Sequence, residues 1–115
     1  MIGSVNYGKD KSLGQTTLDD RDDGGNLAPH FVHYVTLKNL EQSSTYFFSI
    51  TSGSKEYFKD GTNPYQITTG PAIGNSIGEH TLLKGALIYP EQYEKEAIVY
   101  ITSEGGSTIS TLARD

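Results

Sequence analysis

The chain has 115 residues, a length that suits one domain with a modest core. Its net charge is −5 and its nine Lys and Arg residues are scattered singly, which argues against nucleic acid and against an anionic membrane surface as partners. It has no cysteine, which excludes a disulfide scaffold and a thiolate metal site, and no apolar run approaches the roughly 20 residues that span a bilayer, so no membrane insertion is expected.

Turn-forming and aromatic residues dominate the composition. Thirteen glycines, four prolines, eight tyrosines and four phenylalanines favour strands joined by frequent turns. No segment shows a sustained period of 3.6 residues, so the sequence predicts an all-β chain of seven or eight strands. In chain order the predicted strands cover residues 4–7, 15–18, 31–37, 45–52, 64–69, 81–89, 97–102 and 107–112.

Two of these strands show the clearest alternation of side chains. Residues 45–52 give the strongest signal, with Tyr46, Phe48 and Ile50 on one face. Residues 31–37 place four side chains on one face: Phe31, His33, Val35 and Leu37. These faces are the predicted core.

Polar segments separate the strands. Residues 19–26 form a charged loop that we expect in solvent, and residues 53–63 are predicted to be a long polar hairpin loop. Residues 71–80 are rich in small side chains and have the composition of a linker. The sequence thus divides into a first group of strands at 1–70, this linker, and additional strands at 81–115.

A resemblance to the fibronectin type III family is carried by Leu40, Ser44 and Tyr46, whose spacing matches the approach to strand F in that family. Gln42 stands where the family usually has proline. The resemblance implies an immunoglobulin-like β-sandwich in which Tyr46 is the tyrosine corner, with its hydroxyl bonded to upstream backbone. It also implies a packing role for four residues: Leu40, Tyr46, Phe48 and Ile50.

The resemblance covers roughly residues 2–70 and begins at the family's strand C, so strands A and B have no counterpart there. Residues 83–88 and 97–102 resemble the start of a carboxypeptidase-regulatory-like or related immunoglobulin-like β-domain. We expect the tail strands to take the positions of the missing strands A and B. They would do so in the same chain, as a permuted sandwich, or in a neighbouring chain by strand exchange; the arrangement within one chain is the expected one.

The acidic loop is the best candidate for a metal site. Calcium prefers six to eight oxygen ligands, often from Asp residues at alternate positions beside a Gly turn. Asp20, Asp22 and Gly24 partly fit this pattern, Asp23 adds a carboxylate, and no Glu stands at the distance of the usual bidentate ligand. Calcium binding and a solvated loop beside an edge strand are both compatible with the sequence, and no other cofactor is expected.

Histidines and aromatic residues provide the remaining candidates. His30 and His33 are three residues apart, which places them on opposite faces of a strand and disfavours one shared metal ion. Tyr57, Phe58 and Tyr93 lie in predicted loops, where aromatic rings stack on sugars, pack on proteins or cap the ends of a sandwich.

The sequence predicts no enzyme, because no serine lies in a Gly-x-Ser-x-Gly turn and paired carboxylates such as Glu94 and Glu96 lie in a polar segment. The leading hypothesis is a non-catalytic structural or adhesion module in an extracellular or cell-surface assembly of bacterial type. It would belong to a longer exported protein and bind protein, a second copy included. The alternative is an accessory module that binds glycan or substrate beside a secreted hydrolase.

Overall fold

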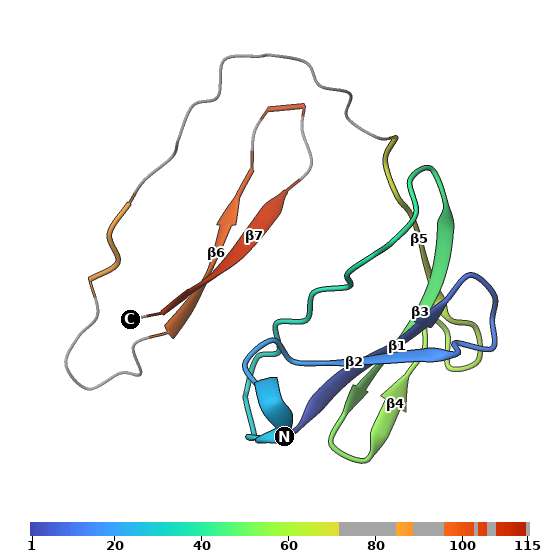
Figure 1. Cartoon of the computed structure of the whole chain (residues 1–115), viewed down its shortest axis with the longest axis horizontal. Coiled ribbons are helices and arrows are strands. Elements are labelled where there is room, and N and C mark those ends of the chain that lie inside the picture. Colours follow the sequence, from blue (N-terminus) through green and yellow to red (C-terminus); the bar gives the residue numbers. More distant parts are fainter. Residues whose placement is uncertain (72–84, 89–95, 103, 106–107, 115) are drawn as a thin grey trace. The chain divides into compact units, whose positions relative to one another are not determined.

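The computed structural model describes residues 1–71, 85–88, 96–102, 104–105 and 108–114. These residues form seven strands in two antiparallel sheets and one short 3-10 turn, η1 (Asp23–Gly25) (Figure 1). The chain divides into two compact units, Met1–Asn75 and Ser76–Asp115. No helix long and apolar enough to cross a membrane occurs in the described part of the chain. The predicted all-β class is therefore confirmed.

The first unit is built around β3 (Thr45–Ser52), which is rich in aromatic and β-branched residues. One edge of β3 pairs with β1 (Gly3–Gly8), and β1 pairs in turn with β2 (Gln15–Leu18). The other edge of β3 pairs with β4 (Lys55–Tyr57) over its C-terminal half and with β5 (Tyr65–Thr68) over its N-terminal half. All pairs are antiparallel, and the order across the sheet is β2, β1, β3 and then β4 with β5.

The register gives this sheet one apolar face. Val5 lies opposite Ile50, and Tyr7 lies opposite Phe48, so their side chains share a face. On the other face, Glu56 accepts hydrogen bonds from the side chains of Asn6 and Ser49. These bonds lower the pKa of Glu56, with the Ser49 hydroxyl as the larger cause. One face thus carries apolar side chains, and the other carries a hydrogen-bonded polar group that includes the buried Ser49.

The apolar face is only partly covered. Among the described residues, Tyr7 and Tyr46 are the only large apolar side chains that are buried, at 8% and 5% exposure. Ile50 and Ile67 remain 38% and 52% exposed, although both lie on the apolar face. A sandwich needs a second layer over such a face.

The predicted strand at residues 31–37 is wrong as an element of a sheet, since the structure has no strand there. The chain runs from η1 back to the start of β3 (Figure 1), and the described backbone bond to residues 31–37, from the Asp20 amide to the Tyr34 carbonyl, does not make a ladder. Alternation of side chains is a property of the segment itself, whereas a strand also requires a partner. The partner that the fibronectin type III resemblance would supply, strand B, has no counterpart in residues 1–71.

The predicted loop at residues 53–63 is also wrong in part, because it contains β4. The register of Ser52 opposite Lys55 leaves Gly53 and Ser54 as a two-residue hairpin loop. Gly53 has a φ of +62°, which this tight loop demands and which glycine adopts without strain. All three residues of β4 are exposed, so hydrophobic alternation gave no signal for it.

The second unit contains a hairpin of β6 (Glu96–Ile101) and β7 (Ile109–Arg114). Both were predicted, with β7 placed two residues too early. The register sets Glu96 opposite Arg114 and Ile101 opposite Ile109, which favours the later position because it pairs opposite charges and apolar residues. Residues 85–88, the described part of the predicted strand 81–89, form no strand.

Candidate functional site

Charged and polar side chains gather where β2 ends and the chain turns through η1. We call five residues the Asp–His cluster: Asp19, Arg21, Asp22, His30 and His33. Their side chains come from the acidic loop and from the segment that follows it, and the two Asp side chains have no exposed surface.

Asp19 is the central acceptor of the cluster. Its Oδ1 and Oδ2 each accept a hydrogen bond of 2.8 Å from the guanidinium of Arg21, from Nε and one terminal nitrogen respectively. The backbone amides of Arg21 and Tyr34 donate to the same carboxylate at 3.1 and 2.9 Å, and His33 Nδ1 lies 3.3 Å away. One buried carboxylate therefore fixes groups from two separate segments.

The protonation of Asp19 follows from these contacts. Burial by itself raises the pKa of this carboxyl group, because it disfavours the charged form. Hydrogen bonds from the Arg21 side chain and from the two backbone amides outweigh burial and hold the pKa well below its usual range. Asp19 is thus an ionised structural anchor at neutral pH.

The other two described carboxylates hold the same segment. Asp20 accepts bonds from the amide and hydroxyl of Thr36, at 2.8 and 2.5 Å. Asp22 Oδ1 accepts the amide of Ala28 at 2.9 Å and lies 3.4 Å from His30 Nε2. Both carboxylates thus accept hydrogen bonds from backbone amides of the segment that follows the acidic loop.

The acidic loop gives no support to the predicted calcium site. In the part of the chain that the structure describes, no three His, Asp or Glu side chains are grouped so that they could hold a metal ion. Asp20 and Asp22 point to different backbone amides, Thr36 and Ala28. The side chain of Asp23 lies outside the described residues.

The expectation that His30 and His33 lie on opposite faces of a strand is wrong. Their rings meet edge to face, with centroids 6.4 Å apart. Each histidine contacts its own aspartate, His30 with Asp22 and His33 with Asp19. The alternation rule fails because this segment is no strand.

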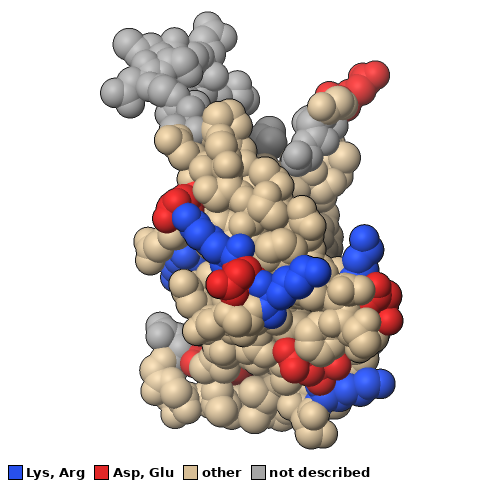
Figure 2. All heavy atoms as spheres, turned by 90° about the vertical axis from the view of Figure 1, so that its right-hand side faces the viewer, with Lys and Arg blue, Asp and Glu red and all other residues tan. Residues whose placement is uncertain are grey.

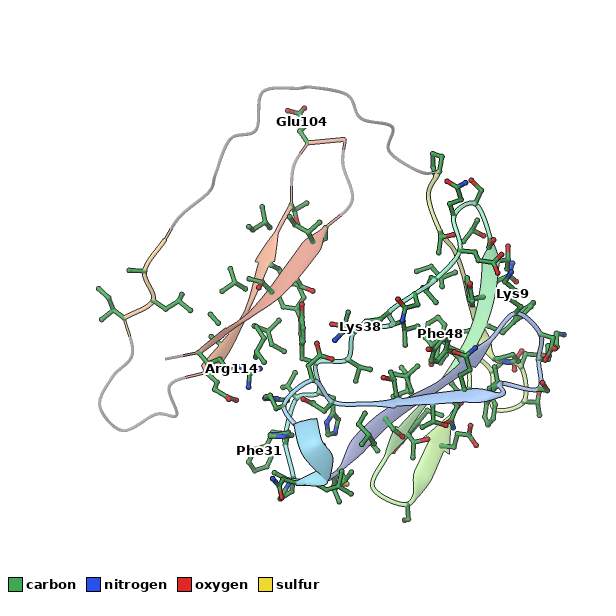
Figure 3. All side chains as sticks on the ribbon, viewed as in Figure 1. Lys9, Phe31, Lys38, Phe48, Glu104 and Arg114 are labelled. Carbon is green, nitrogen blue, oxygen red and sulfur yellow. The ribbon has the colours of Figure 1, made fainter. Side chains whose placement is uncertain are left out.

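The described residues show no flat surface formed jointly by the candidate ligand-binding aromatic side chains. Tyr57 is 42% exposed, and the ammonium of Lys55 lies 4.9 Å from its ring centroid. Phe58 is half-buried, and Tyr93 lies outside the described residues. Among the described residues, Phe31 is the most exposed apolar side chain, and it projects away from the ribbon near η1 (Figure 3).

The predicted packing residues lie in different environments. Tyr46 is buried, and its hydroxyl accepts a hydrogen bond of 2.9 Å from the backbone amide of Glu41. Phe48 stacks on Tyr65 with ring centroids 5.2 Å apart, and Leu40 is half-buried. Ile50 remains exposed because the described residues place no layer over it.

Charges are mixed over the surface in view. Figure 2 shows Lys and Arg side chains interspersed with Asp and Glu on one face. The arrangement agrees with the scattered basic residues of the sequence.

The role of Asp19 was missed in the sequence. Its neighbours Asp20, Asp22 and Asp23 partly match a calcium-binding pattern, whereas Asp19 stands at the boundary between strand and loop. The signal that could have found it is the Asp-x-Arg spacing, which allows a carboxylate to accept both the amide and the guanidinium two residues later.

In comparisons with known proteins, no family model, no curated protein and no solved structure matches the chain.

Proposed function

We propose that this chain is a non-catalytic structural or adhesion module of an extracellular assembly, built as an immunoglobulin-like sandwich of the fibronectin type III kind. The observation that carries the proposal is the Tyr46 hydroxyl bonded to the Glu41 amide ahead of a central strand. A buried tyrosine at this corner, bonded to backbone a few residues upstream, is typical of that architecture.

The sheet order supports the same proposal. The strands β2, β1, β3 and then β4 with β5 follow the order C′, C, F and G of one layer of such a sandwich. The segment at residues 33–37 then occupies the place of strand E in the opposite layer. Asp19 and Asp20 tie this segment to the end of β2, because they accept hydrogen bonds from the amides of Tyr34 and Thr36.

A module in an extracellular stalk carries force, so its sheet should unfold cooperatively under load. We expect a single force peak for the first unit when the chain is pulled between marker domains. Its contour-length gain should be ~250 Å, from the extended length per residue of the unit Met1–Asn75. Extension of this unit without a resolved peak would contradict the mechanical role.

The alternative, an accessory glycan-binding module, rests on the exposed ring of Tyr57. One face of this ring is occupied by Lys55, which leaves less surface for a sugar. A glycan array probed with the chain and with Tyr57→Ala separates the two functions. We expect no signal from either chain; saturable binding that the substitution abolishes would establish the accessory role instead.

A further inference from the structure

Residues 33–37 are hydrogen-bonded along one edge. The amides of Tyr34 and Thr36 donate to the carboxylates of Asp19 and Asp20 at 2.9 and 2.8 Å. The carbonyl of Tyr34 accepts from the amide of Asp20 at 2.8 Å. Bonds at every second residue are those of an extended chain, in which successive residues direct their backbone N–H and C=O groups to opposite edges.

The opposite edge of this segment is open. It presents the backbone N–H and C=O groups of His33, Val35 and Leu37, and within the described residues of the first unit none of these groups has a hydrogen-bond partner. We call residues 33–37 the acceptor edge. A row of unpaired backbone groups on an extended segment is a template for an added strand.

Apolar surface accompanies the acceptor edge. Ile50, Tyr57 and Ile67 share the apolar face of the first sheet and are between 38% and 52% exposed. Strands added along the acceptor edge, on the side away from Asp19 and Asp20, would extend a second layer over this face. The incoming element therefore has to carry apolar side chains and at least one free strand edge.

The β6–β7 hairpin meets both requirements. Val99 and Ile101 lie on one of its faces, and Ile98 and Leu112 lie on the other. The first of these faces borders an apolar groove of about 560 Å³ together with Leu87. Strands with apolar residues on both faces are typical of strands covered on both sides, and a two-stranded hairpin is at best marginally stable alone.

We infer that the acceptor edge binds the β6–β7 hairpin of a second copy of this chain. Each copy carries one acceptor edge and one hairpin, so two copies satisfy each other reciprocally in a closed dimer. The inference rests on the proposed sandwich and names the partner that completes it.

Light scattering on a sizing column tests the inference with the full chain. Since one chain has a mass of 12.5 kDa, we expect a species of twice that mass. A chain that stays at 12.5 kDa at all concentrations would overturn the inference, whether its hairpin folds back on the same chain or binds a different protein.

Paired variants locate the interface. Val35→Pro removes an amide that the first unit does not use and blocks strand addition. Val99→Asp places a charge on the apolar face of the hairpin. Each variant alone should be monomeric, whereas an equimolar mixture should recover a dimer through its one intact edge and one intact hairpin. A dimer that persists in either variant alone would overturn the assignment.

Hydrogen exchange of the unmodified chain provides a test that does not depend on the folding of a variant. The amides of Val35 and Leu37 should exchange slowly where the dimer is populated and rapidly on dilution to monomer. Rapid exchange in the dimer would place its interface elsewhere. None of these outcomes alters the force and glycan experiments, so a failure here is distinguishable from a failure of the proposed function.

Discussion

At the scale of single residues, polar side chains fix segments that lack a strand partner. Asp19 holds Arg21 and the amide of Tyr34, and the Tyr46 hydroxyl holds the amide of Glu41. In each case a buried side chain accepts the hydrogen bond that a neighbouring backbone carbonyl would otherwise accept. Loss of the acceptor leaves a partly buried amide without a partner, which costs more free energy than the bond itself contributes.

Replacement of Tyr46 by phenylalanine isolates the hydroxyl. Tyr46→Phe should lower the free energy of unfolding by about 1–2 kcal/mol, because the Glu41 amide loses its acceptor. Tyr57→Phe is the matched control, since it keeps the ring beside Lys55 on an exposed side chain. Urea denaturation followed by circular dichroism measures both. Equal stability of the two variants would refute the anchoring role of Tyr46.

Removal of the Asp19 charge should change both stability and its pH dependence. Asp19→Asn should cost on the order of 2–4 kcal/mol, because Arg21 loses the carboxylate that pairs with it. The pKa of Asp19 is lowered in the folded chain, so its contribution is complete above the unfolded value of 3.8 and is lost as pH falls below it.

The unfolding free energy of the unmodified chain should therefore fall more steeply below about pH 4 than that of Asp19→Asn. Asp60→Asn is the comparison variant: the pKa of Asp60 is also lowered, mainly by hydrogen bonds from Asn63, so this variant measures how much an exposed carboxylate contributes to the same slope. Urea melts at several acidic pH values measure the slope. Parallel curves for the unmodified chain and Asp19→Asn would contradict the role of this carboxylate.

At the scale of elements, the segment at residues 31–37 is held by its close approach to β1. The ring of His33 lies over Gly3, where a built Cβ atom would come within 2.4 Å of the imidazole. The amide of Asp19 bonds to the carbonyl of Gly3 at 3.3 Å, so the same residue also receives the end of the acidic loop. Glycine is required at position 3 because any side chain there would collide with the His33 ring.

A methyl group at position 3 should loosen the segment from the sheet. Gly3→Ala forces the His33 ring to move and should destabilise the chain by about 1–3 kcal/mol through overpacking. Gly14→Ala is the control, because nothing lies within 4 Å of its added Cβ. Thermal melts of both variants measure the difference. If both variants melted alike, the segment would not pack on Gly3.

At the scale of the whole molecule, each unit contains sheet without a complete core. The first unit leaves part of its apolar face exposed, and the hairpin of the second carries apolar residues on both faces. Hydrophobic burial is the main favourable term in folding, so each unit gains stability from an added layer. Association of two copies would supply that layer to both.

The midpoint of thermal unfolding should therefore rise with chain concentration, because a folded dimer is favoured by mass action. Val35→Pro should abolish this dependence, while Thr16→Ala, a change of an exposed side chain on the face opposite the apolar one, should preserve it. Differential scanning calorimetry over a hundredfold range of concentration measures it. A midpoint that does not move for the unmodified chain would argue against association.

Much of the local structure follows from the sequence alone. Strand β3 begins and ends where the alternation of Tyr46, Phe48 and Ile50 predicts, and β1, β2 and β5 lie within a residue of their predicted bounds. Side-chain periodicity, turn residues and the absence of a helical period are properties of consecutive residues, so they can be read without tertiary information.

Only the tertiary structure decided which extended segments became strands and what the acidic residues do. Residues 31–37 alternate like a strand but form no ladder with a neighbouring strand, whereas the exposed residues of β4 form a strand because Gly53 turns them back onto β3. Asp19 and Asp22 became anchors because the chain returns to them eight or more residues later with His30 and His33. Pairing and burial depend on contacts between residues distant in the sequence, and local periodicity does not encode those contacts.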